Sequence, residues 1–384
     1  MKKIGVGVIG TGGISHRHVP ALLANRNVKL VAGCDVDRGR LRAWCDRYGV
    51  EKQYTDVNEM LKDDEIEVVE VLTRVTPRAR LTIASAEAGK HCLIEKPMCL
   101  TLREADEVIA SAKKNHVKVM VGAAYLFLSC NVKARALIDE GRIGRPKQIR
   151  IIDGRTPVGG FLESKTVTSP PEPPRAPMRG SKPAKPAYWE DFDMGHHYWS
   201  MARYFMQWAD IVEIASISVP NFRSWAGVNP TSAPLAVWRY RENQLGTLNH
   251  LDDNTFNYHG IRVDIFGTEG MIETMGDGGG PTVTGIKLAP LILYTRGRTE
   301  YFRFEEETDP HREVGYWNFA FKNEIDHLIN CVLQDTEPCY TIEDARKDHA
   351  CLLAWIRSAQ TERPASPNDV PLDYVPEGAG VPPR

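Results

Sequence analysis

A glycine-rich turn near the start of the chain constrains the fold more than any other feature of the sequence. The mostly apolar segment 4–9 is typical of a buried strand, and it runs directly into Gly10-Thr11-Gly12-Gly13-Ile14-Ser15. In such a turn the first glycine permits a sharp bend, the second lets the backbone approach a pyrophosphate, and a small third residue allows close helix–strand packing. The N-terminus of the following helix favours phosphate. The sequence therefore predicts a dinucleotide-binding unit that uses Gly10, Thr11, Gly12, Gly13 and Ile14.

An acidic residue at the end of the second predicted strand bears on the choice of cofactor. The strand pattern 28–34 ends in Asp35, at the spacing of the carboxylate that accepts the adenosine ribose hydroxyls in NAD-binding folds. A carboxylate there repels the 2′-phosphate of NADP, so NAD is the predicted cofactor. Arg38 and Arg40 follow closely and leave NADP open as the alternative. A plain turn residue is the other interpretation of Asp35, disfavoured because the fingerprint precedes it.

Strand and helix patterns alternate as far as residue 121. Helical patterns cover 38–48, 77–88 and 101–115, and apolar strand patterns cover 67–73, 91–94 and 117–121. The last of these helices opens on Thr101-Leu102-Arg103-Glu104, which fits a capping box. Strands that alternate with helices in short units predict a doubly wound parallel α/β sheet, and we expect this Rossmann domain to span residues 1–124.

A second group of polar residues stands at the end of one of these strands. The segment His91-Cys92-Leu93-Ile94-Glu95-Lys96-Pro97 is an apolar run that ends on a carboxylate, a lysine and a proline. Side chains at the carboxyl end of a parallel strand point into the crevice where open α/β sheets bind ligands. Lys96 is therefore expected beside the cofactor, with Pro97 limiting how the chain turns away. A solvated loop residue is the common alternative for such a lysine.

A paired histidine in the middle of the chain is the candidate for proton transfer. Asp193 and His197 are four residues apart, so they share one face of a helix that the sequence predicts here. A metal site of Asp193, His196 and His197 is disfavoured, because adjacent histidines on a helix diverge. A capping aspartate with a structural histidine is the other alternative. Catalysis by His197 is favoured, because Lys96 and the fingerprint point to the same chemistry, and His196 is assigned to packing or to the polarity of the cleft.

The overall composition excludes several classes of protein. The chain of 384 residues is long enough for two cored domains, and its net charge of -2 gives no footprint for nucleic acid or an anionic membrane. Eight cysteines without a Cys-x-x-Cys pair argue against structural zinc and favour reduced thiols. The apolar run at the N-terminus is short and broken by Gly5 and Gly7, so no signal peptide is expected, and no stretch is long enough to span a bilayer. These observations predict a cytoplasmic protein.

The second half of the chain predicts an α+β domain, residues 125–362, built on a large and mostly antiparallel open sheet. Strand patterns occur at 148–153, 211–219, 235–240, 246–251, 261–266 and 301–304, and helical patterns at 133–142, 317–333 and 342–359. The proline-rich segment 161–186 is expected to be a surface excursion, or alternatively an arm that covers the cleft or reaches a neighbouring subunit. The Pro/Gly-rich tail, residues 363–384, is expected to be loosely held.

These motifs together resemble the glucose–fructose oxidoreductase and inositol dehydrogenase family. The resemblance rests on Gly10-Thr11-Gly12-Gly13-Ile14, Glu87-Ala88-Gly89-Lys90-His91, Glu95-Lys96-Pro97 with Thr101 and Glu104, and Gly267-Thr268-Glu269-Gly270. The family's Asp-x-Gly-x-His-x-x-Asp is carried as Asp193, Gly195, His197 and, in place of the last aspartate, Ser200. After the fourth strand, Thr73-Arg74-Val75 stands where the family usually has Thr-Pro-Asn.

The resemblance implies an NAD-dependent oxidoreductase that transfers hydride between NAD and a secondary hydroxyl of a sugar, glycoside or polyol, with carbon 3 of a pyranoside as one candidate position. A homo-oligomer, dimer or tetramer, is also implied. The implied catalytic residues are Lys96, Asp193 and His197; the implied cofactor contacts add Asp35, Thr73, Glu95 and Lys96; the implied substrate contacts are Lys96, Tyr125, Trp189, Asp193, His196 and His197.

In the expected reaction His197 exchanges the hydroxyl proton, because a histidine titrates near neutrality, and Lys96 stabilises charge on the same oxygen. Proton transfer by Lys96 is the alternative assignment. Two other functions stay open: a glycosidase that uses transient oxidation and elimination by NAD, and a non-catalytic protein that senses NAD.

Overall fold

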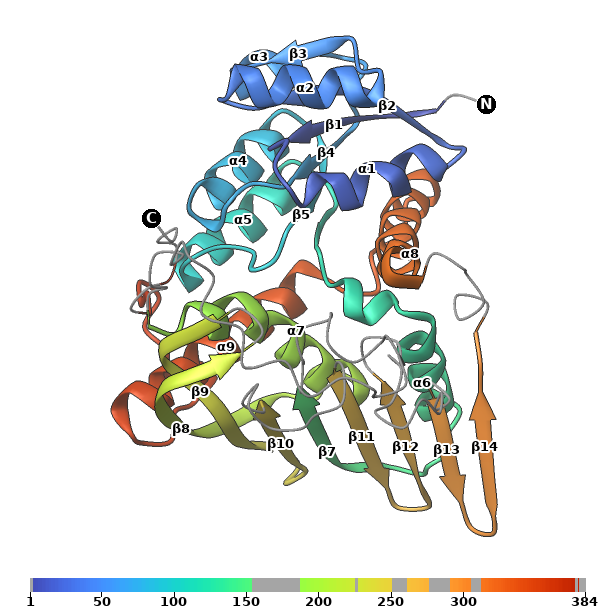
Figure 1. Cartoon of the computed structure of the whole chain (residues 1–384), viewed down its shortest axis with the longest axis vertical. Coiled ribbons are helices and arrows are strands. Elements are labelled where there is room, and N and C mark those ends of the chain that lie inside the picture. The colour runs from blue at the N-terminus through green and yellow to red at the C-terminus, as the bar shows by residue number, and fades with distance from the viewer. Residues whose placement is uncertain are drawn as a thin grey trace, which may run out of the picture.

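Two β-sheets, one above the other in Figure 1, organise the molecule. The computed structural model describes residues 3–153, 187–224, 227–250, 261–275, 291–304, 312–376 and 379. The first sheet has the strand order β3-β2-β1-β4-β5-β6 and the second has the order β14-β13-β12-β11-β7-β10-β9-β8. The proline-rich segment 161–186 lies outside the described residues. No helix in the described ranges combines the length and the apolar character needed to cross a bilayer.

The first sheet confirms the predicted doubly wound Rossmann fold. Its strands are all parallel: β1 (Ile4–Ile9), β2 (Val28–Cys34), β3 (Lys52–Tyr54), β4 (Val68–Val71), β5 (His91–Ile94) and β6 (Val119–Val121). Between them run α1 (Ser15–Ala24), α2 (Arg38–Tyr48), α3 (Val57–Leu61), α4 (Val75–Glu87) and α5 (Leu102–Lys114). The strand order reverses between β1 and β4, and ligands bind at such a switch point in open α/β sheets.

Local signals in the sequence set the ends of these helices. The capping box of α5 is present, because Thr101 Oγ1 accepts from Glu104 N at 3.1 Å and a Glu104 oxygen accepts from Thr101 N at 3.3 Å. Asp37 caps α2 by accepting from Arg40 N at 3.0 Å, and Gly49 ends that helix with φ 68°. Helix α4 begins two residues before Pro77, which therefore lies in its first turn, where its missing N–H is not needed.

The second sheet is mostly antiparallel, as predicted. Its strands are β7 (Pro146–Asp153), β8 (Ile211–Ser224), β9 (Gly227–Tyr240), β10 (Leu245–His250), β11 (Ile261–Gly267), β12 (Gly270–Met275), β13 (Leu291–Thr295) and β14 (Arg298–Phe302), and the β7–β10 pair alone among these pairings is parallel. The Gly267-Thr268-Glu269-Gly270 turn joins β11 to β12. A Cβ on Gly267 would lie 2.0 Å from the carbonyl oxygen of Ile143, so only glycine fits there. The sequence had not predicted β12 or β13.

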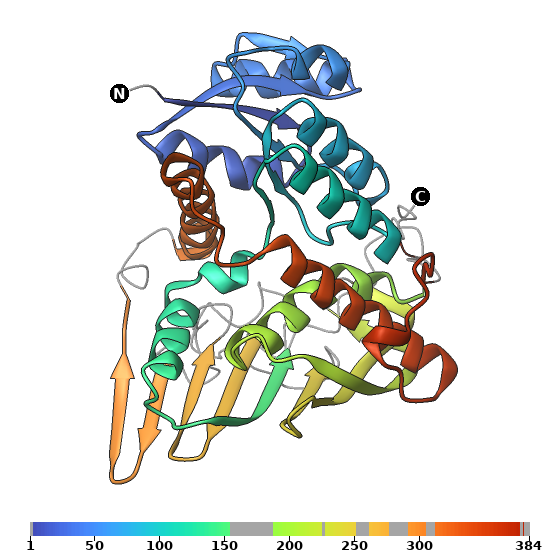
Figure 2. The ribbon, with the colours of Figure 1, turned by 180° about the vertical axis from the view of Figure 1, so that it is seen from behind.

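Helices cover one face of the second sheet. The segment after β6 forms the short helix η1 (Ala124–Phe127) and then α6 (Ser129–Asp139); α6, α7 (Trp189–Phe205) and α9 (Ile342–Thr361) contact the sheet on the side that faces the viewer in Figure 2. Helix α8 (Arg312–Gln334) instead lies beside α1 in both views. The chain therefore returns to the first lobe before it ends, and α8 links the two predicted domains.

The prediction of a loosely held tail is wrong for residues 363–376. Ala365 exchanges two backbone hydrogen bonds with Ile214 at 2.9 and 2.8 Å, which adds a bridge beside β8. The guanidinium of Arg103 donates to both carboxylate oxygens of Asp373 at 2.5 and 2.6 Å, and Val370 is buried. The tail docks on the protein despite its high content of proline. The contacts that hold it come from residues that are distant in the sequence.

Candidate active site

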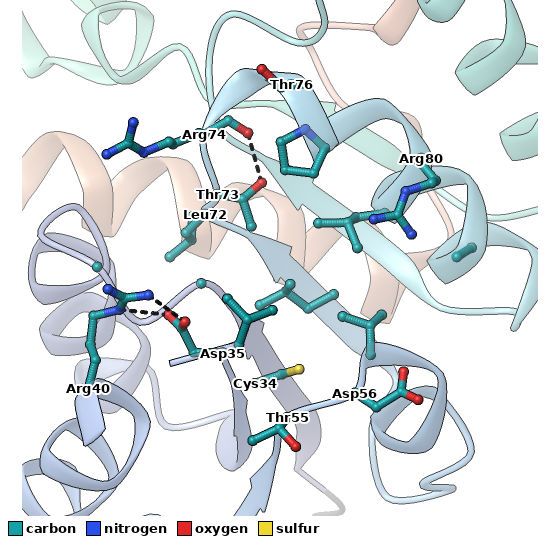
Figure 3. A pocket seen from close by; sticks show the side chains of 18 of the residues that line it. Cys34, Asp35, Arg40, Thr55, Asp56, Leu72, Thr73, Arg74, Thr76 and Arg80 are labelled. Carbon is teal, nitrogen blue, oxygen red and sulfur yellow. Dashed lines mark hydrogen bonds and ion pairs between the residues drawn. The ribbon is translucent and has the colours of Figure 1, made fainter. Parts of the chain in front are cut away.

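A cavity of about 1100 Å³ opens at the carboxyl ends of the central strands of the first sheet (Figure 3). It lies at the reversal of strand order, where the fold is expected to hold a ligand. Six of the predicted cofactor residues and three arginines are among the residues that line it: Gly10, Gly12, Gly13, Ile14, Asp35, Thr73, Arg40, Arg74 and Arg80. Thr11 is buried directly behind Asp35.

The glycine-rich turn has the geometry that a pyrophosphate needs. Gly10 has φ 94°, and a Cβ there would lie 2.8 Å from the carbonyl oxygen of Leu72, so the bend requires glycine. A Cβ on Gly12 or Gly13 would meet no protein atom within 4 Å, so those side chains would project into open space. Ser15 Oγ donates to Gly12 O at 2.6 Å and accepts from Trp44 Nε1 at 2.9 Å, which fixes the start of α1. The turn thus fits the phosphates of a dinucleotide.

The carboxylate of Asp35 is held rigidly at the end of β2. It accepts from Thr11 N and Thr11 Oγ1, both at 2.9 Å, and from the guanidinium of Arg40 at 3.0 and 2.6 Å. Burial alone would raise the pKa of Asp35, but the hydrogen bonds from Arg40, Asp37 N and Thr11 lower it to about 2. Asp35 is therefore ionised at neutral pH and stands where the ribose of NAD is expected.

Lys96 leaves the first lobe and reaches the second. Its Nζ donates to Asp193 Oδ1 at 3.0 Å and to Asp193 O at 3.1 Å. The Lys96–Pro97 peptide bond is cis. The buried guanidinium of Arg78 donates to the carbonyl oxygens of Thr73 and Pro97, so it ties the loop that lines the cofactor cavity to the loop that carries the lysine. Burial lowers the pKa of Arg78 to about 10, which leaves it protonated at neutral pH.

Glu95 points away from the cavity. Its Oε2 accepts from Lys96 N at 2.8 Å, and its Oε1 lies 3.2 Å from Nε2 of the fully buried His18, whose Nδ1 lies 3.2 Å from Glu70 Oε2. Burial opposes protonation of His18, but Glu70 and Glu95 raise its pKa to about 10. The structure therefore brings Glu95 into a buried ion cluster and not into contact with the cavity. Sequence reasoning missed His18 and Glu70; a carboxylate inside the apolar run Val68-Val69-Glu70-Val71 was the available signal.

Helix α7 carries the acid and the imidazole on one face, as predicted. It begins at Trp189, so Asp193 lies one turn inside the helix and His197 one turn further on. The His197 ring packs on Tyr125 of η1, with 4.4 Å between ring centroids. Lys96 contacts Asp193, one turn earlier on the same helix. The structure thus brings together four predicted site residues, Lys96, Tyr125, Asp193 and His197, from three separate parts of the chain.

The glycine between Asp193 and His197 has a packing role. A Cβ on Gly195 would lie 2.4 Å from Leu352 Cδ1 and 2.9 Å from Trp355 Cζ3, both on α9. The two helices can approach this closely only if residue 195 has no side chain. Ser200, which replaces the last aspartate of the family pattern, donates to His197 O at 3.2 Å and is fully buried.

The structure does not bring His196 to the same side as His197. His196 is fully buried, its Nε2 lies 3.3 Å from the hydroxyl of Tyr340, and burial lowers its pKa to about 3. The two imidazole rings diverge, with centroids 6.3 Å apart and planes at 74°. This placement gives no support to His196 as a substrate contact. Among the described residues no three His, Cys, Asp or Glu side chains converge as metal ligands would. Trp189 lies at the first position of α7.

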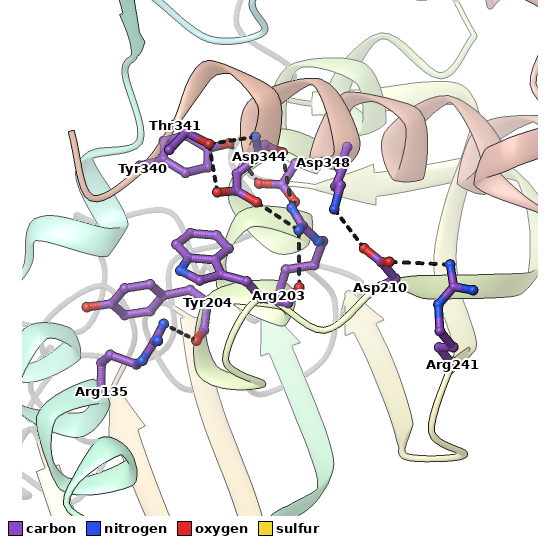
Figure 4. A network of polar contacts seen from close by, with 11 residues as sticks. Arg135, Arg203, Tyr204, Asp210, Arg241, Tyr340, Thr341, Asp344 and Asp348 are labelled. Carbon is purple, nitrogen blue, oxygen red and sulfur yellow. Dashed lines mark hydrogen bonds and ion pairs between the residues drawn. The ribbon is translucent and has the colours of Figure 1, made fainter. Parts of the chain in front are cut away.

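A buried ion cluster holds α7 against α9 (Figure 4). The guanidinium of Arg203 donates to Asp348 Oδ1 and to Asp344 Oδ1, both at 2.9 Å, and Tyr340 donates to the second oxygen of Asp348 at 2.7 Å. Although burial works against the charged form, Asp348 and Asp344 raise the pKa of Arg203. Because Tyr340 also contacts His196, the cluster fixes the rotation of the helix that carries Asp193 and His197.

The fold, the phosphate turn and the ribose carboxylate define a nicotinamide-dinucleotide-dependent oxidoreductase. Comparison with known proteins agrees: residues 4–123 match the family model described as "Oxidoreductase family, NAD-binding Rossmann fold". A myo-inositol 2-dehydrogenase of Thermotoga maritima is 30% identical over 269 residues, which are 70% of this chain and 74% of that protein. The chain belongs to this family, which is the glucose–fructose oxidoreductase and inositol dehydrogenase family, and it is an NAD-dependent enzyme of the sugar and polyol dehydrogenase class.

Solved structures share the whole architecture. A probable dehydrogenase from Thermotoga maritima superposes with a TM-score of 0.72 at 24% identity and covers 96% of this chain and 100% of its own. A levoglucosan dehydrogenase, solved in complex with NADH, superposes with a TM-score of 0.73 at 18% identity and covers 95% of this chain and 99% of its own. At these identities the likeness establishes the fold, with both sheets included.

Proposed function

We propose that this enzyme oxidises a secondary ring hydroxyl of a sugar, glycoside or polyol, such as that at carbon 3 of a pyranoside, and passes the hydride to NAD. The observation that carries the proposal is the contact between Lys96 and Asp193, with His197 one turn further along the same helix. The relatives support the substrate class, since one is named as a myo-inositol dehydrogenase and another as a levoglucosan dehydrogenase.

Lys96 serves in this scheme as the charge that stabilises the reacting oxygen. Hydride acceptance is the chemistry that the nicotinamide supplies when NAD is bound. As the carbon is oxidised, negative charge develops on the hydroxyl oxygen, and an ammonium fixed beside it lowers that barrier. The side chain of Lys96 is 17% exposed and bonded to Asp193, so it is already oriented before substrate arrives. Asp193 offsets the lysine charge and can accept from a neighbouring substrate hydroxyl.

His197 is proposed to receive the hydroxyl proton. A histidine titrates close to neutrality and can act as base in oxidation and as acid in reduction. Its ring is mostly buried and lies against the aromatic ring of Tyr125, which fixes its orientation. We propose Tyr125 and Trp189 as further contacts to the sugar ring, because apolar ring faces of carbohydrates pack on aromatic side chains. Lys96 as the proton acceptor stays the alternative assignment.

The test is a substrate screen followed by variants of the two residues. Sugars, glycosides and inositols are offered with NAD, and NADH is followed by its absorbance. With the best substrate, Lys96→Met and His197→Asn should each lower kcat by about a hundredfold or more, the range that general acid–base groups supply. Binding of NADH should change less than about threefold, since neither residue lines the cofactor cavity. Lys147→Met, an exposed lysine on β7, is the matched control and should leave kcat unchanged.

Near-normal turnover in both site variants would refute the proposed site. The dependence of kcat on pH separates the two assignments of the proton acceptor. If His197 is the base, the rise of kcat near neutral pH disappears in His197→Asn but persists in Lys96→Met.

Two rival functions give other outcomes. A glycosidase that uses NAD transiently releases free sugar without net NADH, and an NAD-sensing protein binds NADH tightly but turns over no carbohydrate.

We also propose that the enzyme is a cytoplasmic homo-oligomer with the domain boundaries expected from its sequence. All eight cysteines are free, which suits a reducing compartment. The face of the second sheet opposite α9 exposes four large apolar side chains on neighbouring strands: Ile217, Leu235, Val237 and Leu245. An apolar patch on a flat sheet face is typical of a surface that pairs with another copy.

A further inference from the structure

The carboxylate of Asp35 already has a full set of donors from the protein itself. Its Oδ2 accepts from Thr11 N, Thr11 Oγ1 and Arg40 Nε, and its Oδ1 accepts from Asp37 N at 2.9 Å and Arg40 Nη2 at 2.6 Å. A carboxylate offers about four lone-pair sites to donors, and five donors converge on this one. The ribose hydroxyls of a cofactor therefore have to compete with one of them.

Arg40 is the donor best able to leave. The N–H groups of Thr11 and Asp37 belong to the backbone, fixed by the glycine-rich turn and by the residue that caps α2. The side chain of Arg40 is 46% exposed, whereas that of Asp35 is only 6% exposed. Its guanidinium also lies 3.4 Å from Asp37 Oδ2, so it keeps a partner at the rim when it releases Asp35. The guanidinium then stands beside the ribose and not behind it.

The lining of the same cavity carries a net positive charge. Arg74 and Arg80 line it together with Arg40, and neither forms an ion pair with any residue that the structure describes (Figure 3). Asp35 and Asp56 are the acidic residues in the lining, so one positive charge is in excess. Arg40 is the guanidinium in contact with the ribose carboxylate, and arginine binds phosphate through paired hydrogen bonds, so an Arg40 released from Asp35 suits a phosphorylated ribose.

We propose that Arg40 makes the cofactor cavity bispecific, so that the enzyme binds NADP as well as NAD. With NAD, Arg40 withdraws and Asp35 accepts from the ribose hydroxyls. With NADP, Arg40 turns onto the 2′-phosphate and neutralises its repulsion by Asp35. This inference goes beyond the proposed reaction and does not depend on the substrate. Its test is read by binding alone, so its failure would leave the roles of Lys96 and His197 untouched.

Calorimetric titration of the full-length chain with NADH and NADPH tests the proposal at one fixed salt concentration. The unmodified protein should bind NADPH no more than about tenfold more weakly than NADH. Arg40→Gln should weaken the binding of NADPH by about tenfold or more, which is the loss of affinity expected for one charge-assisted contact with a phosphate. The same variant should bind NADH unchanged or up to several-fold more tightly, because Asp35 is relieved of a competing donor. Arg40→Lys keeps the charge and should retain part of the NADPH affinity.

Arg42→Gln is the matched control, since Arg42 lies on the same helix, pairs only with Asp46 among the described residues, and does not line the cavity. It should change neither affinity by more than about twofold, a difference of only about 0.4 kcal/mol. Thermal unfolding of each variant confirms that it folds. The proposal is overturned if the unmodified protein binds NADPH more than tenfold more weakly than NADH. It is equally overturned if Arg40→Gln changes both affinities by the same factor, which would make Arg40 a structural support of Asp35.

Discussion

Four ionisable side chains are buried together in the first lobe, and single residues among them are expected to determine how the stability of the protein changes with pH. His18 lies between Glu70 and Glu95, and Glu324 of α8 accepts from Ala123 N where the chain leaves β6. Burial raises the pKa of Glu324 to about 8, with further repulsion from Glu95 and Glu70, although His18 and the Ala123 N–H oppose the shift. Glu324 is therefore mainly protonated at neutral pH, at the junction of the two lobes.

The variant Glu324→Gln is expected to flatten the loss of stability between about pH 4.5 and pH 8. The folded pKa of about 8 lies above the ordinary value of 4.5, so the contribution of Glu324 is complete below about pH 4.5 and is lost progressively as the pH rises from there through 8. His18, with a folded pKa of about 10, adds a loss in the same direction at higher pH. At pH 9 the variant should melt about 3 °C or more above the unmodified protein, since 1 kcal/mol shifts the Tm of domains of about 150–250 residues by about 2–4 °C.

Thermal unfolding between pH 5 and pH 9 checks this prediction, with the exposed Glu242→Gln as the control that should leave the pH dependence unchanged. At pH 5 the gain should be small, because Glu324 is protonated in the folded protein there. An identical fall in Tm for Glu324→Gln and for the unmodified chain would mean that Glu324 is ionised in the folded state at neutral pH.

At the scale of elements, the contact of α7 with α9 fixes the position of the proposed catalytic residues on α7. Gly195 permits the close approach, and the Arg203 cluster fixes the rotation of the helix. Residues of α7 have different neighbours: Asp193 contacts Lys96 and His197 packs on Tyr125, whereas the fully buried His196 contacts Tyr340. A small displacement of this helix would therefore separate Asp193 from Lys96.

Gly195→Ala should lower both stability and turnover. Its Cβ would overlap Leu352 and Trp355, and overpacking of a tight contact typically costs about 1–3 kcal/mol. The matched control is Gly39→Ala in α2, where the new Cβ would meet nothing closer than 3.4 Å. Because alanine is the better helix former, the control should gain about 0.5–1 kcal/mol. Chemical denaturation of both variants measures the difference, and equal stabilisation by the two alanines would show that α7 and α9 can separate freely.

The sequence predicted the elements of the first sheet well, because each carries a local signal. The fingerprint, the capping box of Thr101 and Glu104, and Pro77 mark helix starts within a few residues, and all three hold in the structure. Strands β12 and β13 were missed, since short strands inside a long segment of mixed composition have little periodicity to detect.

The candidate site could be predicted only where its residues fall into a motif. Lys96, Asp193 and His197 were proposed in this way, and the structure places Lys96 in contact with Asp193 and His197 one turn further along the same helix. The partners that hold them were not: Arg203 and Asp348 are 145 positions apart, and His18 and Glu95 are 77 apart. Periodicity reports which face of an element is buried but does not report what lies against it. Pairing across such separations is decided by the tertiary fold.

At the scale of the whole molecule, several contacts join the two lobes around the Lys96–Asp193 pair. Arg346 of α9 donates to both oxygens of Asp106 on α5 at 2.8 and 3.0 Å, and α8 packs on α1. Lys113 of α5 adds an ion pair with Glu343 of α9 at 2.8 Å. The lobes therefore meet through α5, α8 and α9 in addition to the segment after β6, which holds the cofactor cavity and the α7 residues in one arrangement.

The outer face of the second sheet allows a final prediction about assembly. Ile217 lies opposite Leu235, and Val237 is the next outward residue of β9; these side chains are 60%, 41% and 55% exposed, while their inward neighbours are buried under α9. If this face pairs two copies, Val237→Lys places a charge inside the interface and should shift the assembly to single chains of 43.0 kDa.

Leu23→Lys is the control, because Leu23 is as exposed, at 56%, but lies on α1 in the other lobe. Light scattering after size exclusion reads the mass of each. An unmodified protein that is already monomeric, or a Val237→Lys variant with undiminished mass, would rule this face out as the interface, because a lysine buried at the centre of an apolar contact cannot be accommodated without breaking it.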